Sequence, residues 1–171
     1  MRAIYYQEVG KMHSALYYPL AKNIKRGRVK TILAAFAVFL IMCGTASADF
    51  TDNTDGTVSD ISTNLMWQQQ DDGTARTWAD GLTYCKGLSL GGHTDWRLPN
   101  IKELKSIADM TKYNPAIDTT YFLNTASAYY WSSTTYVLDR LYTYAWQVGF
   151  SDGSTDHNYS KIELLNVRCV R

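Results

Sequence analysis

The sequence predicts an α+β domain, in which helices and an antiparallel sheet occupy separate stretches of the chain. Two stretches between positions 77 and 108 have apolar residues at helical spacing, and each begins with a residue suited to cap a helix. The later part of the chain is rich in Tyr, Trp, Val and Thr, which favour strands, and turn-forming residues separate its runs. Because strands and helices do not alternate regularly, a parallel βα architecture is not expected.

The N-terminal stretch differs in kind from the rest and is predicted to be a signal peptide. Its basic residues are Lys25, Arg26, Arg28 and Lys30. The apolar run 31–43 and the small residues Ala46 to Ala48 follow, as in an exported protein cleaved after Ala48. A tether by an uncleaved signal is the alternative, although the run of about 13 residues is shorter than the roughly 20 of a spanning helix. We expect an N-terminal extension and signal peptide at 1–48, and a folded domain at 49–171. That domain would be periplasmic or extracellular, without a membrane span.

Signal cleavage would leave an acidic domain. Residues 49–171 keep 10 of the 17 Lys and Arg residues and 15 of the 16 Asp and Glu residues, so the formal charge falls from +1 to −5. Phosphate binding needs concentrated positive charge, and no basic cluster remains. Nucleic acid and anionic membrane are therefore not expected partners.

Two cysteines, Cys85 and Cys169, remain after the predicted cleavage. An even pair in an oxidising compartment is most simply a disulfide, although two free thiols are the alternative. The bond would close a loop of about 85 residues, for which chain entropy gives on the order of 4 kcal/mol.

The first part of the domain is predicted to be a hairpin followed by a helix. Asp55-Gly56 forms a tight turn between two short extended runs. Thr77 then caps a helix that carries Trp78, Leu82 and Cys85 on one apolar face, so Cys85 should point into the core.

Residues 91–107 are predicted to connect this helix to a second one. After a glycine pair, Trp96 anchors an extended stretch, and Asn100 caps the second helix with Glu103 in a capping box. Ile101, Leu104, Ile107 and Ala108 supply its apolar stripe. Asp95 and Arg97 point to the face opposite Trp96, where they would pair with other segments or meet a ligand.

Strands are predicted at 129–137, 143–153 and 163–171, with a turn at 151–154. Alternation along the strands should bury half of their aromatic residues and expose the other half, with Trp131 and Trp146 in the core. Structural roles are expected for Trp67, Trp78, Asp95, Trp96, Arg97, Trp131, Trp146 and Arg168.

Spaced motifs over nearly all of 50–171 resemble, in order, the Lcl C-terminal domain family. They are "GTVSDISTNLMWQ", "WADGLTYCKGLSLGGHTDWRLPNIKELKSI", "YYWSST", "AWQVGFSDG" and "VRCVR". The resemblance implies an exported bacterial domain with a C-type-lectin-like fold, in which two helices precede a twisted antiparallel sheet with long loops. That fold is also related to formylglycine-generating-enzyme-like domains. The resemblance further implies a disulfide between Cys85 in the first helix and Cys169 in the last strand.

The chain departs from calcium-dependent lectins. It lacks their Glu-Pro-Asn or Gln-Pro-Asp and Trp-Asn-Asp motifs, and it has no collagen-like Gly-X-Y region. "TDNTDG" echoes a calcium loop, but Thr51 and Ser62 would occupy its first and twelfth ligand positions. We interpret it as a solvated turn.

Catalytic and metal chemistry are not expected. After cleavage only His93 and His157 could supply imidazole ligands, and His93 beside Asp95 does not by itself form a triad with a serine. Formylglycine-type oxidation needs a cysteine pair that a disulfide would consume. We expect no cofactor and no metal.

The remaining signal is a surface rich in aromatic and hydroxyl side chains, a combination that suits glycan binding, although these rings could instead only fill the core. We expect a binding module for a glycan or for an envelope or surface partner. The candidate contacts are Ser132, Ser133, Thr134, Tyr136, Asp152, Asp156 and Asn158. An oxidase of the formylglycine-generating kind and a purely structural envelope protein are the alternatives.

Overall fold

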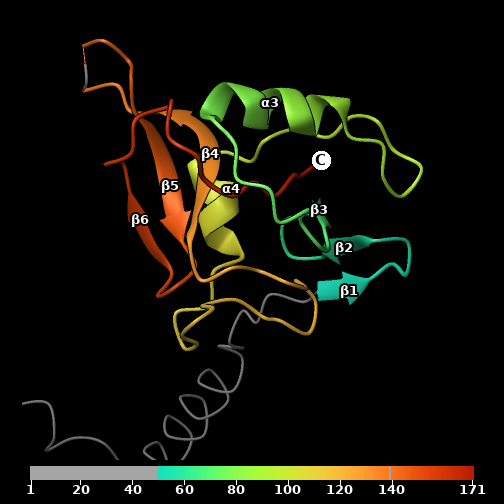
Figure 1. Ribbon diagram of the computed structural model, residues 1–171. Helices are drawn as coiled ribbons and strands as arrows, with labels where there is room; N and C mark the ends of the chain where they lie inside the picture. Colours follow the sequence, from blue (N-terminus) through green and yellow to red (C-terminus); the bar gives the residue numbers. More distant parts are fainter. Residues whose placement is uncertain (1–49, 139) are drawn as a thin grey trace, which may run out of the picture. The chain divides into compact units, whose positions relative to one another are not determined.

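The computed structural model describes residues 50–138 and 140–171 (Figure 1). The predicted signal peptide lies outside these residues. The described part contains two helices and two three-stranded antiparallel sheets, which confirms the α+β class.

The first sheet is a short meander of three strands in sequence order. Strands β1 (Phe50–Asp52), β2 (Thr57–Asp60) and β3 (Leu65–Gln68) pair antiparallel, with Val58 opposite Trp67. The predicted hairpin is confirmed, since β1 and β2 flank the Asp55-Gly56 turn. Gly56 has a φ of +85°, a backbone conformation that favours glycine.

Both predicted helices form, and their predicted caps are present. In α3 (Trp78–Gly87), the Thr77 side chain accepts a hydrogen bond from the backbone of Asp80. In α4 (Ile101–Ser106), Asn100 and Glu103 make both halves of the capping box. The helix ends at Ser106, so Ile107 and Ala108 follow it, although Ile107 is still buried.

The second sheet consists of β4 (Tyr129–Thr135), β5 (Ala145–Gly149) and β6 (Ser154–Asp156), paired antiparallel in that order. The predicted turn before β6 is confirmed. The strand predicted at 163–171 is wrong, because this segment changes partners along its length. It makes isolated bridges from Leu165 to Arg76, Asn166 to Tyr130, and Val170 to both Trp67 and Arg97. No single neighbour provides a continuous ladder.

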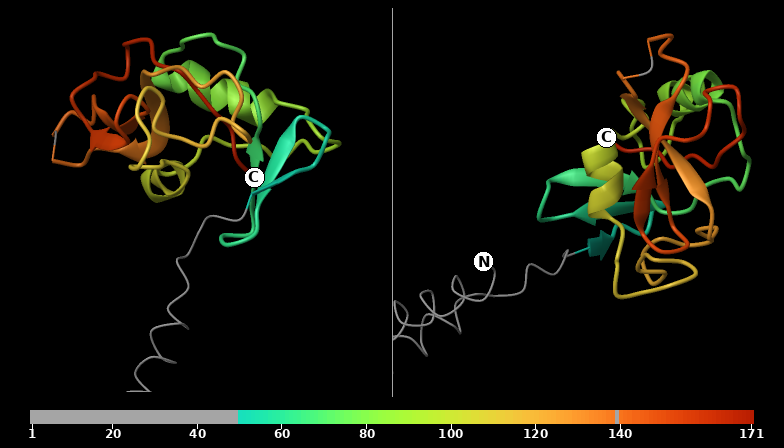
Figure 2. Two further views of the ribbon diagram at one scale, coloured as in Figure 1. Left: turned by 90° about the horizontal axis from the view of Figure 1, so that it is seen from below. Right: turned by 90° about the vertical axis from the view of Figure 1, so that its left-hand side faces the viewer.

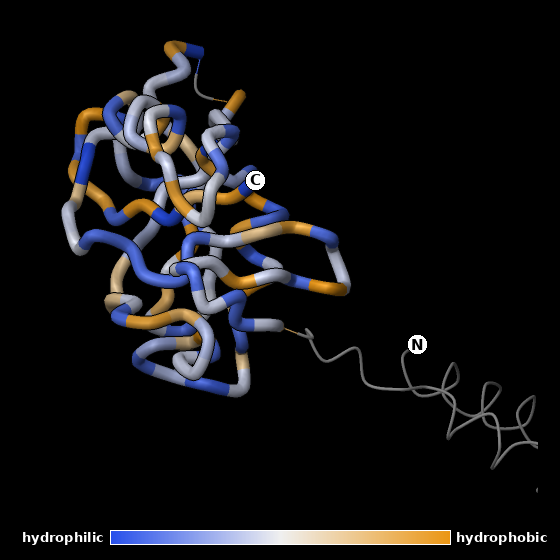
Figure 3. The backbone as a smooth tube through the Cα atoms, turned by 90° about the vertical axis from the view of Figure 1, so that its right-hand side faces the viewer, coloured by the Kyte–Doolittle hydropathy of each residue, from blue (hydrophilic) through white to orange (hydrophobic). Residues whose placement is uncertain are grey.

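The two helices lie on either side of the second sheet (Figure 2). Leu104 of α4 shares a core cluster with Tyr130 and Val148, whereas Cys85 of α3 shares another with Trp131. Neighbouring residues of a strand point to opposite faces, so β4 sends Tyr130 to one cluster and Trp131 to the other. Hydrophobic residues are correspondingly spread along the chain rather than gathered in one block (Figure 3).

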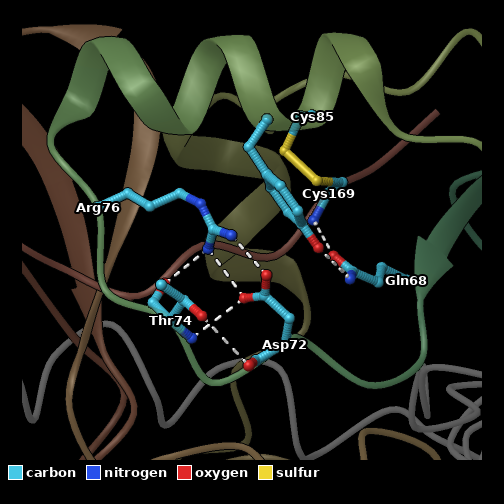
Figure 4. The surroundings of a disulfide bond; sticks show 7 residues. Gln68, Asp72, Thr74, Arg76, Cys85 and Cys169 are labelled. Atoms are coloured by element: carbon cyan, nitrogen blue, oxygen red, sulfur yellow. Dashed lines mark hydrogen bonds and ion pairs between the residues drawn. A yellow bond between two sulfur atoms is a disulfide. The ribbon is translucent and has the colours of Figure 1, made fainter.

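A disulfide joins Cys85 in α3 to Cys169 in the C-terminal segment (Figure 4). Both residues are fully buried. Beside the bond, the Gln68 side chain donates to Tyr84 Oη and accepts from the backbone amide of Cys169. The bond therefore ties the last residues of the chain to α3 and, through Gln68, to β3.

Candidate ligand-binding site

The connector before α4 is held by contacts within the chain. Trp96 is buried and donates its indole N–H to the backbone carbonyl of Leu90 at 3.2 Å. Arg97 donates two hydrogen bonds to Glu103, at 2.7 and 2.8 Å, and holds the pKa of that carboxyl below its ordinary value. Asp95 pairs with Arg171 at 2.7 Å. The structure thus places both charges that flank Trp96 in ion pairs with other segments.

Arg168 lies at the centre of a buried polar network. Its guanidinium donates to the carbonyl oxygen of Gln68 at 2.8 Å, to Asp71 Oδ2 at 3.0 Å and to Thr125 Oγ1 at 2.8 Å. The Tyr130 hydroxyl donates to the same Asp71 oxygen at 2.8 Å. Burial, followed by the nearby Asp71 charge, raises the pKa of Tyr130. The network joins three segments distant in sequence, and all its side chains belong to buried residues.

Three of the predicted contact residues make hydrogen bonds within the chain. Ser132 is fully buried and donates to the carbonyl oxygen of Trp146 at 2.6 Å, so its prediction as a ligand contact is wrong. The backbone amide of Ser133 donates to the carbonyl oxygen of Pro99. Thr134 Oγ1 accepts from the first amide of α4 at 3.0 Å. These hydrogen bonds attach β4 to the start of α4.

Three rings, from Tyr136, Trp146 and His157, form what we call the aromatic cluster. The Tyr136 and His157 rings are stacked, with 3.8 Å between centroids and 6° between planes. The Trp146 ring is nearly perpendicular to both, with centroids 5.7 Å from Tyr136 and 4.9 Å from His157. Each of the three residues is partly exposed. The prediction of Trp146 as a core residue is therefore wrong, because its ring packs on the cluster and belongs to neither core cluster.

Polar groups flank His157 along the chain. Asp156 Oδ1 accepts from the backbone amide of His157 at 2.7 Å. Asn158 Oδ1 accepts from the side-chain amide of Gln147 at 2.6 Å, and Gln147 is fully buried. Of the predicted set, Tyr136 thus stacks on His157, while Asp156 and Asn158 are the chain neighbours of His157. Asp152 is exposed in the turn before β6, where it accepts from the backbone amide of Ser154.

The other tryptophans that were predicted to be structural differ in their exposure. Trp67 and Trp131 are fully buried, and Trp131 donates to the carbonyl oxygen of Arg76 at 3.0 Å. Trp78 is partly exposed and donates to the carbonyl oxygen of Ser132 at 2.8 Å, while the Lys161 ammonium lies 4.1 Å from the centroid of its ring system.

Sequence reasoning missed His157 and Asp71 as partners. His157 follows a strand that was not predicted, and its contact with Tyr136 depends on the register of β4, β5 and β6. Asp71 lies in a loop and meets Arg168 across 97 residues. In both cases the sequence shows only a polar residue outside the predicted helices and strands, which does not reveal a partner.

The β4–β5 hairpin carries exposed apolar residues beyond the aromatic cluster. Val137, Leu138, Leu141 and Tyr142 are all exposed, and hydrophobic segments are visible at this tip in Figure 3. Among the described residues, none of the helices is long and apolar enough to cross a membrane. Within the same residues, no three His, Cys, Asp or Glu side chains are grouped to hold a metal ion.

Comparison with known proteins identifies the family of this chain. The model of the Lcl C-terminal domain matches residues 56–171, which include both sheets except β1, both helices and the disulfide. A search among curated proteins found no match. On the family match, the chain belongs to the Lcl C-terminal domain family.

Proposed function

We propose that this protein is an exported binding module that recognises a glycan of the cell envelope or of another cell surface, without catalysis. The single observation that carries the proposal is the aromatic cluster. The stacked Tyr136 and His157 rings cover one face of each other, so the ligand would meet their outer faces, which are held in a fixed arrangement beside the partly exposed Trp146. Such faces suit the apolar side of a sugar ring, because they bury area with little loss of side-chain freedom.

A hydrogen-bonding group next to the cluster supports the same proposal. Asn158 is the chain neighbour of His157 and is exposed, and its side-chain oxygen accepts from Gln147. Sugar hydroxyls need donors and acceptors of this kind next to the stacking surface. The formal charge of −5 over 49–171 disfavours acidic glycans, so the proposed ligands are neutral or cationic.

A C-type-lectin-like arrangement is part of the proposal. It is supported by the disulfide between the first helix and the last segment, and by two helices that precede the second sheet. The disulfide also weighs against an oxidase of the formylglycine-generating kind, because it occupies both Cys85 and Cys169.

The test is a glycan-array screen of the oxidised protein, with calcium and with chelator, using wild type, Tyr136→Ala and Tyr113→Ala. Tyr113 is a matched control because it is 73% exposed and lies outside the cluster. We expect binding to a sugar class in wild type and Tyr113→Ala, and at least a tenfold loss in Tyr136→Ala. An empty array, or equal binding by all three proteins, would contradict the proposal.

A further inference from the structure

A small hollow lies on the side of the second sheet opposite to that of α4. Its lining residues are Ala128, Tyr129, Tyr159, Leu164, Leu165 and Asn166. The hollow has a volume of about 200 Å³, below the roughly 300–1,000 Å³ of sites for drug-sized ligands. It therefore fits one end group of a ligand rather than a whole oligosaccharide.

Two tyrosine rings form one wall of the hollow. Tyr129 and Tyr159 have centroids 5.2 Å apart and planes inclined by 54°. Tyr129 lies over Gly149, where an added Cβ would come within 3.1 Å of the Tyr129 ring and 3.3 Å of Ser154 Oγ. The absence of a side chain at Gly149 thus leaves room for the Tyr129 ring. Tyr159 is 37% exposed, so a ligand can reach the wall from solvent.

The surroundings of this wall are negative. Tyr129, Ser154 and Asp156 lie on the same face of the sheet. Gly149 is the strand partner of both Tyr129 and Ser154, and Asp156 follows Ser154 by two residues in β6. Burial raises the pKa of Tyr129, and the nearby charges of Asp156 and Asp152 raise it further. Lys161, in the same loop as Tyr159, lies instead over Trp78 and donates to Thr135.

We propose that the Tyr129–Tyr159 hollow binds an organic ammonium group, either a quaternary ammonium or a protonated amine carried by a larger ligand. Aromatic faces attract a cation through their quadrupole, and a nearby carboxylate adds charge attraction. The aliphatic residues Leu164 and Leu165 also line the hollow and suit the methyl or methylene groups around the nitrogen. The site is separate from the aromatic cluster and does not rest on the proposed glycan recognition.

The test compares choline with 3,3-dimethylbutan-1-ol, its neutral isostere, by NMR titration of the full oxidised protein at low salt. We expect saturable shifts of the Ala128 and Asn166 amides with choline, and at least tenfold weaker binding of the neutral alcohol. Added salt should weaken choline binding, since the carboxylate is near the surface. Equal binding of the two compounds, or no saturable binding of choline, would overturn the proposal.

Three variants assign the binding to this site. Tyr159→Ala should weaken choline binding at least tenfold, and Asp156→Asn, which keeps the shape of the side chain, should weaken it severalfold. Tyr113→Ala should leave it unchanged, because that exposed ring lies outside both the hollow and the aromatic cluster. Melting temperatures of the variants show whether each is folded. A folded Tyr159→Ala or Asp156→Asn with unchanged affinity contradicts the site, whatever the glycan array shows.

Discussion

Arg168 and Asp71 form an ion pair in the interior, with 3.0 Å between Nη2 and Oδ2, and side chains that are 0% and 4% exposed. The pair connects the C-terminal segment to the loop after β3. A buried charge is tolerated only when it is paired and hydrogen-bonded, so each partner depends on the other.

Asp71→Ala should therefore destabilise the protein by about 3–5 kcal/mol, since it leaves the Arg168 charge without its counterion. Urea unfolding measures the change. The control is Asp72→Ala, which removes the more exposed pair with Arg76 and should cost about 1 kcal/mol or less. Similar losses in the two variants would show that the buried network does not stabilise the fold.

Trp96→Ala should reduce the free energy of unfolding by about 3–5 kcal/mol, because the ring is buried in the core cluster that contains the disulfide. The melting temperature should therefore fall markedly. Thermal unfolding followed by circular dichroism provides the measurement. Unchanged stability together with altered ligand binding would overturn the assignment of Trp96 as an anchor.

Removal of the disulfide should lower the free energy of unfolding by about 4–5 kcal/mol, because the unfolded chain gains the loop-closure entropy of an 84-residue separation. The double variant Cys85→Ala/Cys169→Ala avoids leaving a single reactive thiol. We expect a lower urea midpoint than in the oxidised wild type, and no thiol titration at positions 85 and 169 in the native oxidised protein. Two reactive thiols there would contradict the bond.

The Arg97–Glu103 pair predicts a pH dependence of stability. Arg97 lowers the pKa of Glu103 in the folded state. The pair's contribution to folding stability is therefore complete above the unfolded-state pKa of about 4.5, and it is lost as the pH falls through the lower folded-state pKa. Glu103→Gln removes the charge and keeps groups that can cap α4. Between about pH 5 and 3, wild type should lose up to about 1 kcal/mol more stability than the variant. Parallel stability curves would contradict this.

The elements that the sequence predicted well are those with local causes. Thr77 and Asn100 cap the helices through residues only three positions away, and the Asp55-Gly56 turn defines the first hairpin. In contrast, 163–171 has the composition of a strand, but its course depends on Arg76, Tyr130 and Trp67, which are distant in sequence. Composition does not encode such pairings.

The same distinction applies to the candidate site. Tyr136, Asp156 and Asn158 were predicted from their residue types; the structure stacks Tyr136 on His157, which lies between the other two in the chain, and their role as ligand contacts stays a prediction. Ser132 and Trp146 were misplaced, because the face on which a strand residue lies, and what covers that face, depend on tertiary packing. The Tyr129–Tyr159 hollow requires contact between β4 and a loop about thirty residues later, which no local pattern indicates.

The C-terminal segment has a consequence for the order of events during synthesis. Residues 165–171 bridge β3, β4 and the connector, and they supply Arg168 and Cys169 to the interior. A growing chain exposes these residues after every other part of the domain has emerged. Both core clusters contain residues of this segment, so we expect neither cluster to close until the segment is available.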